Sequence, residues 1–223
     1  MEYTANSPIY SHWLPLFTVL FGTGCRIGEV IGLRWDDLDY ENREISINHA
    51  VIYRVMENGK AEFHVSTPKT KAGKRKIPMM EAVYQAFRDE YEAQKESGFN
   101  IEICDGMSGF VFANRNGGLH NPANINRAIR RIYEAYNAEE IIKAKKEKRV
   151  PILIPHFSCH HMRHTFCTRL CEVEENIKVA QDIMGHADVS TTLNIYAEAS
   201  DTAKLQAVNN MQKIFDYFLE WFL

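Results

Sequence analysis

Apolar side chains recur at helical spacing over most of the 223 residues of the chain. They are dense from Ser11 to Phe21, where Gly22 and Gly24 end the pattern, and a second helix is predicted to begin near Arg26. Further helices are predicted over residues 81–94, from Pro122 onward, and over residues 162–171, 177–184 and 193–211. The pattern therefore indicates a mainly helical protein.

One segment has a different period. Between Glu44 and Val55 apolar and polar residues alternate, which is typical of a half-buried strand. Asn58 and Gly59 follow, and this pair is a strong signal for a tight hairpin turn. The chain then offers a return strand over 62–66, a second turn at 72–73 and a short third strand that ends at 77–78. We expect a mainly α fold with a small three-stranded antiparallel β-sheet whose basic turn is exposed.

The length and a hydrophobic content of 45% suit one globular domain over residues 1–223. No apolar run approaches the roughly 20 residues that cross a bilayer, and the N-terminus lacks the pattern of a signal peptide. The five cysteines are odd in number, which suits free thiols in a reducing compartment. We therefore expect a cytoplasmic bacterial protein without a membrane partner. Residues 212–223 form a very apolar tail that would pack on its own domain or on a neighbouring protomer.

The formal net charge of −3 disfavours a protein that coats DNA, because phosphate binding usually needs an excess of lysine and arginine. Basic residues nevertheless gather in three stretches, at 69–76, 127–131 and 143–149. Each stretch alone would suit a solvated helix face or hairpin. If the fold brings them together, they would form one DNA-binding face, and both interpretations stand at this point.

Four separated segments contain polar residues without an evident structural role. They are T-G-C-R, which ends at Arg26, T-P-K-T around Lys69, C-H-H-M-R-H-T-F over 159–166, and I-M-G-H through N-I-Y over 183–196. In order and spacing they resemble the motifs of the tyrosine recombinase, or phage integrase, family. The family's T-G-x-R-x-x-E, H-x-L-R-H-T and L-G-H elements are similar to these segments, with Met162 and Met184 in place of the usual leucines. The resemblance covers nearly the whole chain and implies the catalytic-domain fold of that family.

The resemblance implies that Arg26, Arg163 and His186 bind the scissile phosphate of DNA. These residue types suit the task, because a phosphodiester is negatively charged and repels a nucleophile unless cations lie against its oxygens. A guanidinium is permanently charged and donates two parallel hydrogen bonds, which a lysine would not. His186 would hydrogen-bond the same phosphate and help to position it.

Tyr196 is the candidate nucleophile, and the resemblance implies a covalent 3′-phosphotyrosine intermediate. A phenol has a pKa near 10, so it needs a base and a cationic site to attack at neutral pH, and His160 suits the base. By resemblance Lys69 protonates the departing 5′-oxygen, and it is preferred over Lys71 and Lys74 because it lies at the strand end before the turn. Because the phosphotyrosine retains the energy of the broken bond, we expect no cofactor, ATP or metal, and the sequence contains no Walker-type glycine loop.

Three further residues near the motifs are expected to support them. His161 and His164 would face the core or contact the catalytic residues from behind. Glu29 lies one turn after the first catalytic arginine, and it would orient that arginine or cap a helix.

A zinc site is the rival interpretation of this histidine-rich region. His164, Cys167 and Cys171 fall on one helical face, as metal ligands on a helix would. The spacing fits no common closed zinc motif, however, and ligation by His160 would remove the proposed base.

The implied function is site-specific recombination for the integration and excision of a mobile element, as in the integrases of conjugative transposons and phages. A chromosome- or plasmid-dimer resolvase of the same family, a type IB topoisomerase and an inactive DNA-binding regulator on this scaffold are the alternatives. The implied partners are double-stranded DNA and further copies of the chain, with four protomers on two duplexes. Accessory DNA-bending proteins are further candidate partners.

The domain organisation carries one more expectation. Full-length relatives have an N-terminal helical domain that completes a C-shaped clamp on DNA, and no part of this sequence corresponds to it. We therefore expect residues 1–223 to be the catalytic domain alone, with reduced affinity for DNA.

Overall fold

A computed structural model describes residues 1–56, 59–68, 70–174, 176–197 and 211–212. For Lys71, Ile195, Tyr196 and Ala197 it describes the backbone alone. Within these residues, no helix is both long enough and apolar enough to cross a membrane. The prediction of a mainly helical fold with a small antiparallel sheet is confirmed.

The N-terminal part supplies the centre of the core. It comprises α1 (Glu2–Ala5), a short 3₁₀ turn η1 (Ser11–Trp13), α2 (Leu14–Thr23) and α3 (Ile27–Gly32). In α2, Phe17, Val19 and Leu20 are almost fully buried, as the dense apolar pattern predicts. Gly24 ends α2 with a positive φ of 61°, which glycine adopts without steric cost. The chain therefore turns directly from α2 into α3, and Arg26 takes the N-cap position of α3.

Two small sheets replace the single sheet that the alternating pattern predicts. A 3₁₀ turn, η2 (Trp35–Asp37), leads into the first sheet, which contains β1 (Leu38–Asp39), β2 (Glu44–Ile47) and β5 (Arg75–Pro78). The second sheet contains β3 (Ala50–Val55) and β4 (Ala61–Ser66). All pairs are antiparallel, and Ile47 of β2 lies opposite Arg75 of β5. A further 3₁₀ turn, η3 (Lys71–Gly73), precedes β5.

The long strand expected over residues 44–55 is interrupted at Asn48 and His49. The buried His49 ring places Nε2 2.6 Å from the carbonyl oxygen of Gly32, and Asn48 Nδ2 donates to Asp37 Oδ1 at 3.0 Å. His49 ties the chain to the end of α3 and Asn48 ties it to η2, so the chain leaves the first sheet there and begins the second. The local alternation does not reveal such a distant contact.

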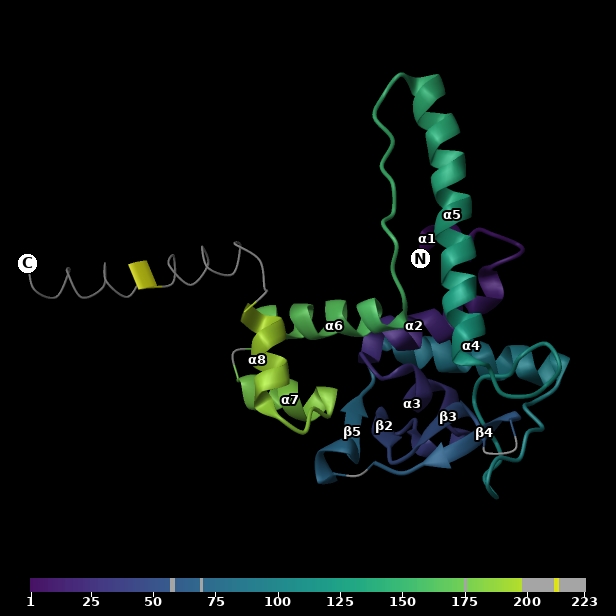
Figure 1. The fold of residues 1–223 in the computed structure, drawn as a ribbon, viewed down its shortest axis with the longest axis vertical. Coiled ribbons are helices and arrows are strands. Elements are labelled where there is room, and N and C mark those ends of the chain that lie inside the picture. The colour runs from purple at the N-terminus through teal and green to yellow at the C-terminus, as the bar shows by residue number, and fades with distance from the viewer. Residues whose placement is uncertain (57–58, 69, 175, 198–210, 213–223) are drawn as a thin grey trace, which may run out of the picture.

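Helix α4 (Glu81–Ser97) packs against α2, and α5 (Pro122–Glu147) is the longest helix of the described chain. Asn121 caps α5 by accepting a hydrogen bond from the backbone N–H of Ala123 at 2.8 Å, and Pro122 occupies its first turn, where its missing N–H costs nothing. Figure 1 shows α5 standing away from the sheets, with the following segment running back alongside it to α6. Within the stretch 143–149, expected as an exposed loop or helix end, residues 143–147 form the end of this helix and Lys148 is its C-cap.

The last described helices form a separate layer. Helix α6 (Cys159–Val173) packs on α2 and also contacts α7 (Ile177–Met184) and α8 (Val189–Ala197) (Figure 1). Between them lies a small second core of Cys167, Cys171, Ala180 and Met184. All five cysteines of the chain are buried and free. Helix α7 also approaches β5, and this contact brings the C-terminal motifs to the N-terminal ones.

Candidate active site

Three predicted site residues from distant segments meet in one cluster. Arg26 caps α3, Arg163 lies on α6, and His186 follows the end of α7. Arg163 is 6% exposed, and its guanidinium donates to the carbonyl oxygen of Gly24 at 2.6 Å. The side chain of Arg26 is 48% exposed, so it remains open to a ligand.

The C-terminal end of α7 holds the cluster together. Its last two carbonyl oxygens and that of its C-cap, Gly185, each accept a hydrogen bond from a different arginine: Ile183 from Arg75 at 2.7 Å, Met184 from Arg163 at 2.7 Å, and Gly185 from Arg26 at 3.4 Å. The end of a helix leaves such carbonyls unpaired, and the helix dipole makes this end favourable for cations.

Gly185 is required where these arginines converge. Its φ of 65° is left-handed, and a Cβ at this position would lie 2.8 Å from Nη1 of Arg75. The glycine of the M-G-H motif therefore lets Arg75 approach the helix end closely. The glycine of this motif is therefore needed for packing, in addition to marking the motif in the sequence.

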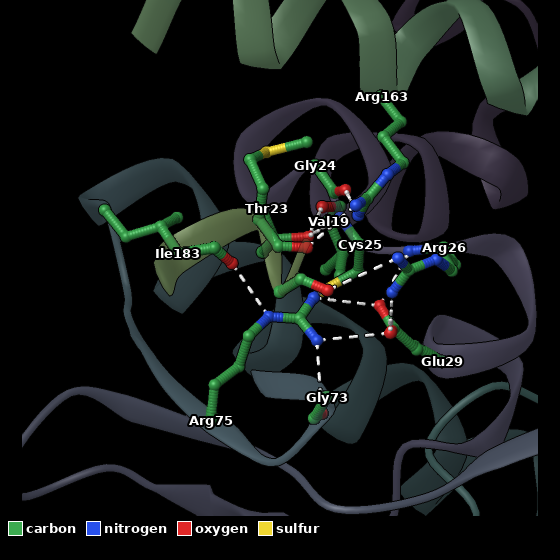
Figure 2. Close-up of polar contacts among 12 residues, drawn as sticks. Val19, Thr23, Gly24, Cys25, Arg26, Glu29, Gly73, Arg75, Arg163 and Ile183 are labelled. Atoms are coloured by element: carbon green, nitrogen blue, oxygen red, sulfur yellow. Dashed lines mark hydrogen bonds and ion pairs between the residues drawn. The ribbon is translucent and has the colours of Figure 1, made fainter. Parts of the chain in front are cut away.

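The carboxylate of Glu29 joins two of the arginines (Figure 2). It accepts from the backbone N–H of Arg26 at 2.8 Å and from Arg26 Nη1 at 2.9 Å, so it both caps α3 and orients the side chain, the two roles expected of it. Burial alone would raise the pKa of Glu29, but hydrogen bonds from Arg75 and Arg26 outweigh it and lower that pKa. Glu29 is therefore ionised at neutral pH.

Sequence reasoning missed Arg75, which it treated as one member of an exposed basic stretch. The side chain is only 6% exposed and forms a two-pronged ion pair with Glu29, with Nη1 to Oε1 at 3.1 Å and Nη2 to Oε2 at 2.9 Å. A signal was present in the strand pattern. Arg75 lies two residues before the buried Ile77, so both side chains fall on the inner face of β5.

Positive charge exceeds negative charge in this cluster. The described residues contribute three guanidiniums, from Arg26, Arg75 and Arg163, and one carboxylate, from Glu29. Burial and then the neighbouring Arg26 lower the pKa of Arg163 to about 10, which still leaves it charged at pH 7. An excess of buried and half-buried positive charge suits an anionic ligand such as a phosphodiester.

His186 lies at the inner edge of the cluster and is 6% exposed. Its Nδ1 is 2.9 Å from Oγ1 of Thr192 on α8. Burial, followed by the charges of Arg163 and Arg26, lowers the pKa of His186 to about 4. The ring is therefore neutral at pH 7 and suits a hydrogen-bonding role rather than a cationic one.

The three histidines at the start of α6 differ in their surroundings. His160 is exposed, with its Nε2 3.1 Å from Nε2 of His164, and burial followed by His164 lowers its pKa. The neutral form that a base requires is thus favoured. Of the two positions expected for His161, the core is wrong, because this residue is exposed and its Nδ1 lies 2.8 Å from Oγ of Ser158, capping α6. His164 is partly buried.

The order of these motifs agrees with a known protein family. The sequence profile of the phage integrase family matches residues 1–203. The chain belongs to this family of tyrosine recombinases. It is 37% identical over 195 residues to the transposase of transposon Tn916 from Enterococcus faecalis, and 26% identical over 207 residues to a XerC-like tyrosine recombinase from Caldanaerobacter subterraneus.

These matches cover 87% and 90% of the chain, but only 44% and 49% of the two relatives, so the chain spans less than half of their length. Among solved structures, the Tn1549 transposon integrase in complex with transposon right end DNA is 34% identical, with a TM-score of 0.77 over 95% of this chain and 62% of that one. The XerA recombinase, at 21% identity and a TM-score of 0.62 over 94% of this chain and 60% of that one, shares the fold.

Two predicted catalytic residues of this phage integrase family member, Lys69 and Tyr196, have side chains outside the described structure. Lys69 lies outside the described residues, in the connection between β4 and β5. The backbone of Tyr196 belongs to α8, the helix that Thr192 links to His186, while its side chain is outside the described part. Their roles stay predictions.

The zinc interpretation can be compared with the geometry of the described residues. Among them, no group of three or more His, Cys, Asp or Glu side chains is arranged to hold a metal ion. Cys167 and Cys171 are instead packed in the small core between α6 and α7.

Proposed function

We propose that this chain is the catalytic part of a site-specific DNA recombinase that integrates and excises a mobile element. The cluster of Arg26, Arg163 and His186, with its excess of positive charge, carries the proposal. It joins three segments far apart in the sequence, and an anionic scissile phosphate would complete it.

In the proposed reaction, the phenolic oxygen of Tyr196 attacks the scissile phosphorus, and the bond to the 5′-oxygen breaks. His160 accepts the phenol proton, and Lys69 supplies the proton that the departing 5′-oxygen takes up. The two arginines stabilise the charge on the non-bridging oxygens, while neutral His186 holds one of these oxygens. The product is a 3′-phosphotyrosine, and attack by another strand's 5′-hydroxyl reverses the steps.

A mobile-element role is favoured over dimer resolution by the comparisons. The chain is 37% identical to a Tn916 transposase and 26% identical to a XerC-like recombinase. The integrase structure at 34% identity is bound to transposon-end DNA. Double-stranded DNA is therefore the proposed substrate, in the reducing bacterial cytoplasm that the five free cysteines suit. Recombination between two duplexes would use four protomers, with room for accessory DNA-bending proteins.

An inactive DNA-binding regulator is the alternative from another class. The set of motif residues from Arg26 to Tyr196 is intact, which argues against it. Formation of a covalent adduct separates the two functions, because a regulator would bind DNA without being joined to it.

The test traps the intermediate without knowledge of the target site. A library of nicked duplexes with a randomised central sequence, in which the short cleaved piece diffuses away, is incubated with the chain in EDTA. We expect a slower-migrating protein band on a denaturing gel, whose attached DNA is then sequenced. Tyr196→Phe should bind DNA and give no band. An adduct with Tyr196→Phe would contradict the nucleophile, and no adduct with any library member would favour the regulator.

A further inference from the structure

Arg75 is a buried arginine that the proposed reaction leaves without a task. It is held on two sides, by the Glu29 carboxylate at 2.9 and 3.1 Å and by the carbonyl oxygen of Ile183 at 2.7 Å (Figure 2). Its backbone is fixed by pairing with Ile47 in the first sheet. These buried contacts therefore fix the guanidinium of Arg75 beside Glu29.

Glu29 stands between two competing arginines. The same carboxylate that pairs with Arg75 also accepts a hydrogen bond from Arg26 Nη1 at 2.9 Å. A single carboxylate neutralises about one positive charge, and its effect on a neighbour is large where water is scarce, as at this 6% exposed side chain. With Arg75 in place, the pair of Arg75 and Glu29 is nearly neutral, and the charge of Arg26 remains available.

The situation reverses if Arg75 is lost. Arg26 is then the one cation that directly contacts the buried Glu29 in the described structure. A buried carboxylate without a compensating charge is strongly unfavourable, so Glu29 would hold the guanidinium of Arg26, with which it is already paired at 2.9 Å, as its main counter-charge. The phosphate would then meet an arginine whose charge is already neutralised.

We propose that Arg75 is a positioning residue of the strand-transfer reaction: by neutralising Glu29, it keeps the charge of Arg26 free for the scissile phosphate. The carbonyl of Ile183 holds Arg75 in the orientation that this pairing needs. The inference rests on the proposed function, because it assigns Arg75 a task at that same phosphate.

A double-mutant cycle tests the dependence on Glu29. With a duplex selected from the nicked library, single-turnover adduct formation is measured for the wild type, Arg75→Gln, Glu29→Gln and the double variant. We expect Arg75→Gln to slow adduct formation by about 100-fold when Glu29 is present, similar to the loss of one transition-state donor. In the Glu29→Gln background, the same change should cost less than about threefold, since no carboxylate is left to capture Arg26. If Arg75→Gln alone fails to fold, the Glu29→Gln background, which lacks the uncompensated carboxylate, still gives a test: a large loss on adding Arg75→Gln there would overturn the inference.

A second substrate separates an effect of charge from damage to the fold, because damage would slow the reaction equally on both substrates. If the scissile phosphate is replaced by a methylphosphonate, which carries no charge, the reaction no longer depends on the positive charge of Arg26. The defect of Arg75→Gln should then shrink to less than about threefold. Arg43→Gln is the matched control, because it removes an arginine from an exposed ion pair with Glu81 outside the cluster, and its rates should stay unchanged.

The outcomes separate the two proposals. If the wild type forms no adduct, the proposed function fails. Three results with a reactive wild type would overturn the inference on Arg75 while the proposed function stands. Arg75→Gln could have no effect, or it could slow the reaction equally on both substrates. It could also be as damaging in the Glu29→Gln background as it is when Glu29 is present.

Discussion

Arginine at positions 26, 75 and 163 does more than supply charge. Each guanidinium bridges two separate parts of the chain: Arg163 joins Gly24 to Met184, Arg75 joins Glu29 to Ile183, and Arg26 joins Glu29 to Gly185. The planar fork has donors in several fixed directions, whereas a lysine ammonium is a compact charge on a flexible stem. The arginines therefore assemble the site as well as bind its ligand.

At the same scale, His186 makes the stability of the protein depend on pH. Its pKa is about 4 in the folded protein against 6.5 in the unfolded chain, so between these values the unfolded state binds more protons. The part of the free energy of unfolding that depends on the neutral His186 ring is fully present above pH 6.5 and is lost as the pH falls to 4. The shift corresponds to about 3 kcal/mol. We expect the wild type to lose this much more free energy of unfolding than His186→Gln between pH 7 and pH 4.

Thermal or urea unfolding across this pH range provides the measurement. The comparison with His186→Gln is needed because burial also lowers the pKa of His120 to about 4, and His120 is present in both proteins. Parallel stability curves for the two proteins would show that His186 titrates normally in the folded state.

At the scale of elements, the extended segment that returns along α5 is attached by side chains rather than by a strand partner. Asn137 donates to the carbonyl oxygen of Ile154 and accepts from its N–H, both at 2.8 Å, and Glu140 accepts from the N–H of Ile152 at 2.8 Å. Arg149 adds an ion pair to Glu140. The segment leads into α6, so these bonds help to set where α6 begins.

We predict that Asn137→Ala loosens this segment without unfolding the protein. The N–H of Ile154 loses its partner, and its protection against hydrogen exchange should fall by an amount equivalent to about 1 kcal/mol. The melting temperature should fall by no more than about 4 °C, as expected for a change of this size in a chain of this length. Unchanged exchange at Ile154 would contradict the attachment.

At the scale of the whole molecule, the net charge of −3 conceals an uneven distribution. One arginine of each of the three basic stretches illustrates this. Arg75 of the first is buried in the site, while Arg130 of the second and Arg149 of the third pair with glutamates of α5. The positive charge that matters for a phosphate is concentrated where α3, α6, α7 and β5 meet.

The apolar tail gives a prediction at this scale, although it lies outside the described residues. Removal of residues 215–223, F-D-Y-F-L-E-W-F-L, should weaken assembly of several protomers on DNA more than it weakens folding. We expect assembly on a two-site duplex to fall by at least about tenfold, the equivalent of about 1.4 kcal/mol. Sedimentation and gel shift measure assembly, and a collapse of the melting temperature would instead indicate that the tail packs on its own domain.

The sequence alone determined most of the helices and the identity of the candidate catalytic residues. Helix α7 begins and ends at the predicted residues, because its apolar period and Gly185 are local signals. The motifs around Arg26, Arg163 and His186 were identified by their resemblance to those of a known family, and the residue types suit the binding of a phosphate.

Only the tertiary structure decided how these residues are held. The break at Asn48 and His49, the three carbonyls at the end of α7 and the burial of Arg75 all depend on contacts between segments far apart in the chain. A local pattern records which face of an element is apolar, but not which backbone oxygen a distant side chain will meet. The residues that could act on a phosphate were therefore predictable, and the hydrogen bonds that arrange them were not.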